Sequence, residues 1–237
     1  MIVRYAVLND IHFPYESQAY YRALDIIASW DNLEAIYLNG DIVEIETLSR
    51  HPRSSDTISN FQYEVDYANK RFDEIQARFP DIPVHLVEGN HCYRLFRYIR
   101  DVCPELWGML EYPTLFRFSD RGWRFYPYGP GQWVKCGKAD LWLRHEPLSM
   151  GLSSSKLTAD RCLVDVLYGH VHTHQYSVIK KHGPVTRLIK AYAGGWLGDI
   201  SKPIFDYRGS KDNWVQGFNE ITCETDTGAY EYRFHFL

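Results

Sequence analysis

The stretch Val84-His85-Leu86-Val87-Glu88-Gly89-Asn90-His91 decides the fold. It begins as a short apolar run, typical of a buried strand, and ends in a polar turn that contains a glycine. Two earlier runs, Ile2–Leu8 and Ala35–Leu38, have the same form and also end in polar turns. Between these runs, the helical spacing of apolar residues predicts helices over Ser17–Trp30 and Ile58–Phe79. Strands that alternate with helices predict a parallel sheet with right-handed crossovers.

The second half of the chain has a different rhythm. Cys92–Val102 is predicted to be a helix, and after Gly122 short strands and turns follow one another. The last two apolar runs are joined by Asp226-Thr227-Gly228, which indicates a hairpin. We therefore expect a second, more antiparallel sheet in this half. Its predicted strands are Trp123–Tyr126, Gln132–Lys135, Ala139–Arg144, Cys162–Tyr168, Tyr176–Lys180, Phe218–Glu224 and Ala229–Phe236.

The composition excludes several classes of protein. The chain has 237 residues, 45% of them hydrophobic, so it can bury a large core without a disulfide framework. Its five cysteines include no Cys-x-x-Cys pair, which argues against a disulfide scaffold and against a thiolate zinc site. The N-terminal residues lack the pattern of a signal peptide, and no apolar run approaches the ~20 residues of a membrane span. We expect a single soluble, cytoplasmic domain over residues 1–237 that does not bind membranes.

The charge of the chain says little about its partners. The formal net charge of −4 gives no electrostatic reason for non-specific binding to nucleic acid. It does not exclude a polyanionic substrate, because bound divalent cations would reverse the local field. The oligomeric state stays open.

Polar side chains that can bind a metal follow five of the predicted strands. The carboxyl ends of strands are where open α/β sheets bind ligands, so these five clusters are expected to converge. Gly-Asn-His and Gly-His-x-His are the rarest of them, each expected by chance about 0.02 to 0.03 times in a chain of this composition. The five clusters are Asp10-Ile11-His12, Gly40-Asp41, Gly89-Asn90-His91, His145 and Gly169-His170-Val171-His172.

The donor atoms of these clusters suit a particular group of metals. Asp, Asn and His supply oxygen and nitrogen but no thiolate, which suits Mn²⁺, Fe, Zn²⁺ or Mg²⁺ and disfavours Cu(I) and iron–sulfur clusters. Seven side chains are too many for one tetrahedral ion. They suit two ions that share a bridging carboxylate and leave positions open for water and substrate.

In their order along the chain, these motifs resemble those of the calcineurin-like metallophosphoesterase superfamily, in its nuclease and phosphodiesterase branch. The resemblance runs from Asp10 to His172. It implies an α/β fold, a four-layer α/β/β/α sandwich of two mixed sheets. It also implies two divalent metal ions, with Mn²⁺ favoured and Fe, Zn²⁺, Ni²⁺ or Mg²⁺ left open, and attack on a phosphodiester by a hydroxide that bridges them. One metal would be held by Asp10, His12, Asp41 and His172, and the other by Asp41, Asn90, His145 and His170, with His91 as the catalytic acid.

The sequence departs from the superfamily's pattern at three positions. Glu44 stands where the second motif has its second Asp, a carboxylate that orients the catalytic His. Cys92 stands where an acidic residue follows Gly-Asn-His, and we expect it to pack as a small buried side chain rather than act as a nucleophile. Glu146 follows His145 where glycine is common, so that loop is expected to differ in shape.

The substrate is less well defined by the sequence. No Arg-Gly follows the second motif, which argues against a protein serine/threonine phosphatase. Arg94 and Arg97 would share one face of the predicted helix after His91, a face suited to the phosphates of DNA or RNA. Some of the many aromatic residues could stack on bases. The alternatives are a phosphomonoesterase or nucleotide pyrophosphatase that acts on a small molecule, and a catalytically weakened binding scaffold.

Overall fold

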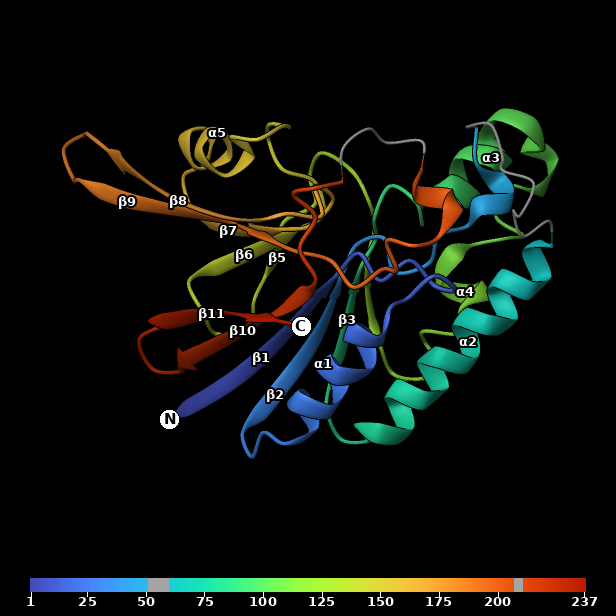
Figure 1. Cartoon of the computed structure of the whole chain (residues 1–237), viewed down its shortest axis with the longest axis horizontal. Coiled ribbons are helices and arrows are strands. Elements are labelled where there is room, and N and C mark those ends of the chain that lie inside the picture. Colours follow the sequence, from blue (N-terminus) through green and yellow to red (C-terminus); the bar gives the residue numbers. More distant parts are fainter. Residues whose placement is uncertain (51–59, 207–210) are drawn as a thin grey trace.

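The computed structural model describes residues 1–50, 60–206 and 211–237, and these residues form two mixed β-sheets with helices on the outside (Figure 1). The first sheet has the strand order β11-β10-β1-β2-β3-β4 and the second has the order β5-β6-β7-β9-β8. The first-sheet strands are β1 (Ile2–Asn9), β2 (Leu33–Asn39), β3 (Val84–Val87), β4 (Arg124–Tyr126), β10 (Gly217–Glu224) and β11 (Tyr230–Phe236). The second sheet contains β5 (Val134–Lys135), β6 (Leu141–Arg144), β7 (Asp165–Tyr168), β8 (His174–Lys181) and β9 (Arg187–Gly194).

The helices cover the two outer faces. In Figure 1, α1 and α2 lie against the first sheet and α5 lies over the second. Helix α1 begins where the Ser17 side chain accepts a hydrogen bond from the backbone N–H of Ala19 (3.1 Å). The described helices are α1 (Gln18–Ala28), α2 (Phe61–Arg78), α3 (Arg94–Val102), α4 (Tyr112–Leu115) and α5 (Ser154–Arg161).

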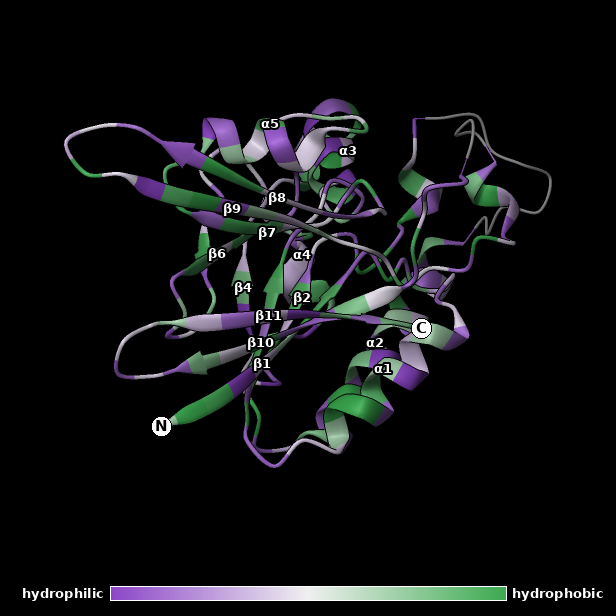
Figure 2. Ribbon diagram, turned by 60° about the vertical axis from the view of Figure 1, so that its left-hand side comes forward, coloured by the Kyte–Doolittle hydropathy of each residue, from purple (hydrophilic) through white to green (hydrophobic). Residues whose placement is uncertain are grey.

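Alternation of side chains along β1 shows why the molecule has four layers. Ala6 and Leu8 pack with α1 and α2, whereas Tyr5 and Val7 point the other way and pack against the second sheet. A third apolar cluster lies between the second sheet and α5. Figure 2 shows hydrophobic residues concentrated along the central strands β1 and β2. The layers are therefore helix, sheet, sheet, helix, as the resemblance implied.

The division of strands between the sheets differs from the prediction. Strand β4 pairs in parallel with β3, and the β10–β11 hairpin joins the first sheet antiparallel to β1. In the second sheet, β6, β7 and β9 are parallel. Local pattern specifies that a segment is a strand but not which edge it pairs with, since that depends on packing.

Most predicted elements have the predicted type, with ends that shift by a few residues. The sequence analysis missed α4, α5 and β9. Residues 58 and 59, at the start of the predicted Ile58–Phe79 helix, lie outside the described residues. In the parts of the chain that the structure describes, no helix is long and apolar enough to cross a membrane.

Candidate metal centre

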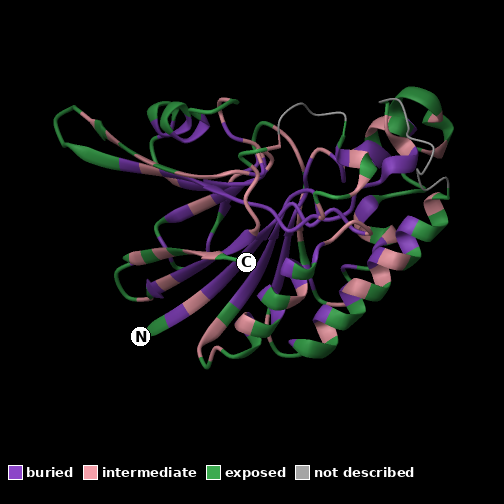
Figure 3. Cartoon of the chain, viewed as in Figure 1, coloured by how far each residue is buried: buried purple, intermediate pink, exposed green. Residues whose placement is uncertain are grey.

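The carboxyl ends of five strands meet at one place between the sheets, and the loops that leave them are buried (Figure 3). Asn39 lies at the end of β2 and ties these ends together. Its side-chain amide donates to the side-chain oxygen of Asn9 (2.9 Å) and to the backbone carbonyl of Arg144 at the end of β6 (3.1 Å). The bond to Arg144 joins the two sheets. The sequence analysis missed this role of Asn39, although its place beside Gly40-Asp41 was a signal.

The first group of donor atoms comes from Asp10, His12 and His172. The Nε2 atoms of the two histidines lie 3.2 Å apart. The Oδ1 atom of Asp10 lies 3.5 Å from Nε2 of His172 and 4.0 Å from Nε2 of His12. All three residues are buried. The structure thus brings together three of the four predicted ligands of the first metal.

The second group comes from Asp41, Asn90, His145 and His170. Nε2 of His145 lies 3.1 Å from Oδ2 of Asp41 and 2.9 Å from Oδ1 of Asn90. Nδ1 of His170 lies 2.8 Å from the same Asn90 oxygen and 3.3 Å from Nε2 of His145. These are the four predicted ligands of the second metal. Asp41 lies with this group, and its sharing with the first group stays a prediction.

The chemistry of these atoms fits a cation in the first group. Nδ1 of His12 lies 2.6 Å from a carboxylate oxygen of Glu44, which fixes the ring proton on Nδ1. The lone pair of Nε2 therefore faces the Asp10 carboxylate and the Nε2 atom of His172. A carboxylate oxygen and imidazole nitrogens gathered this closely are the donor atoms by which proteins hold divalent cations. The residues present thus fit the divalent ions that the resemblance implies.

The backbone is strained at the same residues. Among the described residues other than glycine, seven have positive φ, and five of these seven are predicted ligands. Their φ angles are 50° at Asp10, 58° at His12, 45° at Asp41, 70° at His170 and 57° at His172. Positive φ in residues with a β-carbon is costly and concentrates at functional sites.

Two motif glycines provide the space that the ligands occupy. A β-carbon at Gly89 would overlap the backbone and carboxylate of Asp41, and one at Gly169 would overlap the carboxylate of Asp10. Each glycine therefore lets one strand-end loop approach the ligand of another. This close approach is the physical reason for Gly-Asn-His and Gly-His-x-His as motifs.

Glu44 connects the metal ligands to His91. One of its oxygens lies 2.6 Å from Nδ1 of His12 and 2.8 Å from Nδ1 of His91, and the other accepts from Arg94 at 2.7 Å. Burial alone would raise the pKa of Glu44, but the positive charges of His91 and Arg94 hold it well below its usual value. The longer side chain at this position thus reaches the histidine that it was expected to orient.

His91 lies beside the second group of donors. Its backbone N–H donates to Oδ1 of Asp41 (2.7 Å), and its Nε2 atom is 3.8 Å from Oδ2 of the same carboxylate. Burial lowers the pKa of His91, and the nearby carboxylates of Asp41 and Glu44 oppose this shift. His91 also forms a cluster with His12 and Glu44. Glu44 faces the Nδ1 side of this ring, and the guanidinium of Arg94 donates to Nε2 at 3.4 Å.

The sequence predicted that Arg94 and Arg97 share an exposed face of α3, and the structure does not have such a face. Arg94 is only 5% exposed and donates to both the backbone carbonyl and the side chain of Glu44 (2.7 Å each). Arg97 is partly exposed. The prediction that Arg94 binds nucleic-acid phosphates is therefore wrong, because the buried charge of Glu44 needs this arginine as its partner.

Cys92 packs in the interior, as expected. It is fully buried, and burial raises the pKa of its thiol to about 12. A thiol with this pKa is protonated at neutral pH and is a poor nucleophile. Four residues before Cys92, burial also raises the pKa of Glu88 to about 7.

Two of the aromatic residues considered for base stacking, Trp196 and Trp214, lie against the first group together with Phe205. Trp196 is buried and stacks on His172, with ring centroids 4.8 Å apart. The Trp214 ring meets the same histidine edge-on, with ring centroids 4.4 Å apart, and the ring centroids of Phe205 and His12 are 5.4 Å apart. These contacts fix the imidazole planes and keep water from them. No local pattern in the sequence marked them, since they join segments far apart in the chain.

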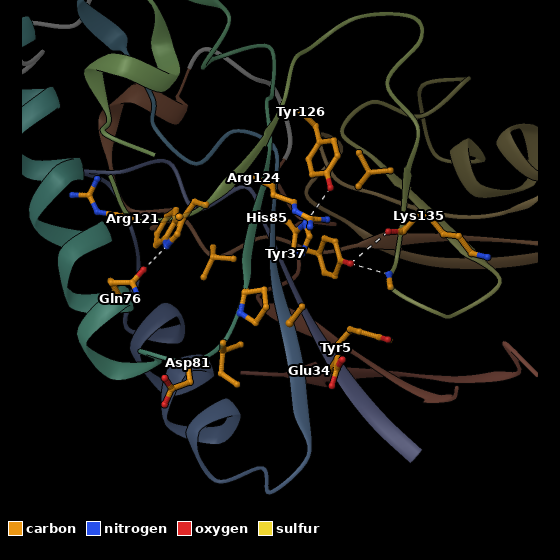
Figure 4. A pocket seen from close by; sticks show the side chains of 18 of the residues that line it. Tyr5, Glu34, Tyr37, Gln76, Asp81, His85, Arg121, Arg124, Tyr126 and Lys135 are labelled. Atoms are coloured by element: carbon orange, nitrogen blue, oxygen red, sulfur yellow. Dashed lines mark hydrogen bonds between the residues drawn. The ribbon is translucent and has the colours of Figure 1, made fainter. Parts of the chain in front are cut away.

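A large cavity lies elsewhere, at the edge formed by β3, β4 and β5 (Figure 4). It has a volume of about 770 Å³, and none of the predicted ligands is among the described residues that line it. His85 stacks between Tyr37 and Tyr126 in its wall, with ring centroids 4.6 Å and 5.9 Å away. The size of a cavity therefore does not locate the metal centre in this protein.

The two mixed sheets and the Asp, Asn and His donors at their strand ends define a metal-binding hydrolase. The chain belongs to the calcineurin-like phosphoesterase family, whose model matches residues 3–184. This membership and the donor groups support binding of divalent metal ions and hydrolysis of phosphate esters.

Individual relatives are distant. The Gene 54 protein of Mycobacterium phage D29 is 23% identical over 248 residues, a match that covers 94% of this chain and 90% of the phage protein. Among solved structures, Vps29 of Chaetomium thermophilum is 9% identical with a TM-score of 0.46, and the match covers 99% of this chain and 95% of that one. Vacuolar Protein Sorting 29 of Cryptosporidium parvum is 11% identical with a TM-score of 0.42, covering 100% and 98%. At these values the structural likeness supports no functional comparison.

Proposed function

We propose that this protein is a phosphodiesterase that uses two divalent metal ions. The observation that carries the proposal is the convergence of seven side chains from five strand ends into two groups of donor atoms. Asp10, His12 and His172 would hold one ion, and Asn90, His145 and His170 the other, with Asp41 in the second group and predicted to bridge. Mn²⁺ is the favoured metal, because carboxylate and imidazole donors without thiolate suit it.

Bound at these side chains, the ions would supply an activated water and neutralise charge on the phosphate oxygens. The other residues of the metal centre would position the substrate and protonate its leaving group. Glu44 lies against Nδ1 of His91, and Nε2, 3.8 Å from Asp41, would be the atom that gives a proton to the leaving group when the ring is protonated. Arg94 balances the charge of Glu44 and thereby keeps both histidines in place.

We further propose that the diester belongs to a nucleic acid, DNA or RNA. The support for this is the D-x-H start of the motif series and the absence of Arg-Gly after Asp41. With Arg94 buried, Arg97 and Arg100 are the α3 arginines that a strand could reach. The competing proposal is a phosphomonoesterase or nucleotide pyrophosphatase that acts on a small molecule.

The test begins with metal-stripped protein that is reloaded separately with Mn²⁺, Fe²⁺, Zn²⁺, Ni²⁺ or Mg²⁺. Each form is assayed with bis- and mono-nitrophenyl phosphate, and then with labelled single- and double-stranded DNA, RNA and mononucleotides. We expect two metal ions per chain and faster hydrolysis of the diester than of the monoester. Hydrolysis of the monoester alone would identify a phosphomonoesterase. A protein that binds two ions but hydrolyses neither ester would be a binding scaffold.

A further inference from the structure

A second cavity, of about 410 Å³, lies between α3 and the segment that follows β4. Its walls are mainly aromatic, and no motif in the sequence pointed to it. Among the residues that line it are Glu88, Tyr93, Phe96, Trp107, Tyr112 and Tyr128.

The rings of this cavity form a continuous wall. Tyr93 and Phe96 stack with centroids 4.8 Å apart and planes 27° from parallel. On one side Tyr128 lies 5.1 Å from Tyr93, and on the other Trp107 lies 4.9 Å from Phe96. Phe96 is 38% exposed and Trp107 is 56% exposed. Large aromatic surfaces left in contact with water around a cavity are typical of a site for a planar ligand.

This wall is built from the loops that carry the predicted metal ligands. Tyr93 follows His91 by two residues, and its backbone N–H donates to the carbonyl of Gly89 (2.9 Å). The hydroxyl of Tyr128 donates to Glu146, the residue after His145 (2.6 Å). The wall therefore adjoins the loops in which Asn90, His91 and His145 lie.

The charge of the lining selects the kind of ligand. The described residues that line the cavity include the carboxylates Glu88 and Glu111 but no Lys, Arg or His. A phosphate finds no cationic side chain in this lining, whereas metal ions bound at the predicted ligands would neutralise it. Glu88 is only 4% exposed, and its carboxylate accepts from the backbone N–H of Tyr128 (2.9 Å). Carboxylates among aromatic rings suit a planar group that has N–H donors. An alkyl chain has no such donors.

We propose that this cavity binds a nucleobase of the substrate, while the phosphate attached to that nucleoside lies at the metal centre. The proposal rests on the proposed function, because it takes the ester to be one of a nucleoside. It makes Phe96 and Trp107 specificity-determining residues. Stacking tolerates every base, so the site favours nucleotide esters over esters without a ring and does not read sequence.

The first experiment measures binding without metal or turnover. Metal-free protein is titrated with adenosine, guanosine, cytidine and uridine by calorimetry. Saturable binding is expected, and Phe96→Ala and Trp107→Ala should each weaken it about 10-fold. Tyr63→Ala is the matched control, since Tyr63 is an aromatic on α2 that is 47% exposed and does not line the cavity. We expect this variant to bind nucleosides as the unchanged protein does.

The second experiment compares two esters in the metal-loaded protein. The ratio of kcat/KM for the nitrophenyl ester of thymidine 5′-phosphate to that for methyl nitrophenyl phosphate should fall in Phe96→Ala and Trp107→Ala, mainly through KM. Failure of all four nucleosides to bind, or equal binding by all variants, would overturn the proposal even if diesters are hydrolysed. Nucleoside binding by a protein that hydrolyses no ester would refute the proposed function and leave the base site standing. Displacement of nucleosides by a decyl-chain amphiphile would identify an aliphatic site instead.

Discussion

At the scale of single residues, Asp41 tests the metal centre most directly. Its carboxylate is buried, and the neighbouring histidines, above all His145, hold its pKa well below the usual value although burial alone would raise it. Asp41→Asn keeps the shape and removes the negative charge that would balance the cations. We expect it to lower kcat/KM by more than about 100-fold and to reduce the metal content. Elemental analysis and diester hydrolysis measure the two effects. Full metal content with normal turnover would remove Asp41 from the site.

His91 is predicted to act on the leaving group and not on the metals. His91→Ala should therefore keep two ions per chain while turnover falls roughly 100-fold or more. The loss should be smaller for nitrophenyl esters, since nitrophenolate needs little protonation to depart. Assays of esters with leaving groups of different pKa, together with elemental analysis, check this. An equal loss for all leaving groups would make His91 a residue that positions phosphate.

The seven predicted ligands could be found from the sequence because each follows a strand end, and parallel strands bring their carboxyl ends together. The residues that hold these ligands in place could not be found from the sequence. Trp196 reaches His172, and Arg94 reaches Glu44, across gaps in the chain that no periodicity spans. The spacing of arginines along a helix does not show which of them is buried. The pattern alone therefore placed Arg94 on the exposed side of α3, although it is buried.

At the scale of elements, α3 carries three arginines, and two of them, Arg94 and Arg97, lie in opposite environments. Arg94 is the buried partner of Glu44, whereas Arg97 is partly exposed. Arg94→Ala leaves a buried carboxylate without this partner, and we expect the free energy of unfolding to fall by about 3–5 kcal/mol. Arg97→Ala should change it by less than about 0.5 kcal/mol. Urea unfolding of both variants measures the difference, and equal effects would contradict the buried pair.

Arg97 is also where the nucleic-acid proposal can be tested apart from stability. If it contacts a phosphate, Arg97→Ala should weaken oligonucleotide binding and reduce the slope of log K against log salt by about 1, because one fewer counterion is released. Titrations of a labelled oligonucleotide at several salt concentrations measure the slope. An unchanged slope would show that no strand lies along this helix.

The individual helices and strands show which features of the fold a local sequence pattern can predict. The short strand Val84–Val87 was predicted with its observed ends, because the run between a proline and a polar turn is too short for a helix. Helix α5 was missed because Ser154–Arg161 is rich in serine and polar residues and has little apolar periodicity. The β10–β11 hairpin was predicted, but its partner β1 lies at the other end of the chain.

At the scale of the whole molecule, the centre depends on how the two sheets are joined. Asn219 of β10 donates to the carbonyl of Val7 in β1 (3.0 Å) and to that of Gly194 in β9 (3.1 Å), so one amide spans both sheets. The side-chain amide of Asn39 also bonds to both sheets, at a point nearer the predicted ligands. Between these links the apolar interface of the sheets excludes water. Donors from both sheets stay in register only while this interface is closed, so the geometry of the centre is a property of the complete fold.

The interface of the sheets also makes stability depend on pH through His85. This histidine lies 8% exposed between Tyr37 and Tyr126 and is hydrogen bonded to the Tyr126 hydroxyl (3.1 Å). Burial, with a smaller effect of Arg124, lowers its pKa to about 4 from an ordinary value of 6.5. Between these two pH values the unfolded chain binds a proton at His85 that the folded chain does not. Its contribution to stability is therefore complete above about pH 6.5 and is lost as the pH falls to about 4.

His85→Gln keeps a polar side chain that cannot titrate in this range. We expect the free energy of unfolding of the unchanged protein to fall more between pH 7 and pH 5 than that of His85→Gln. Urea unfolding of the two metal-free proteins at both pH values measures this difference. The comparison cancels the titration of the ligand histidines, since these are the same in both proteins. Equal losses of stability would mean that the Tyr37–His85–Tyr126 stack opens to water, and with it this edge of the sandwich.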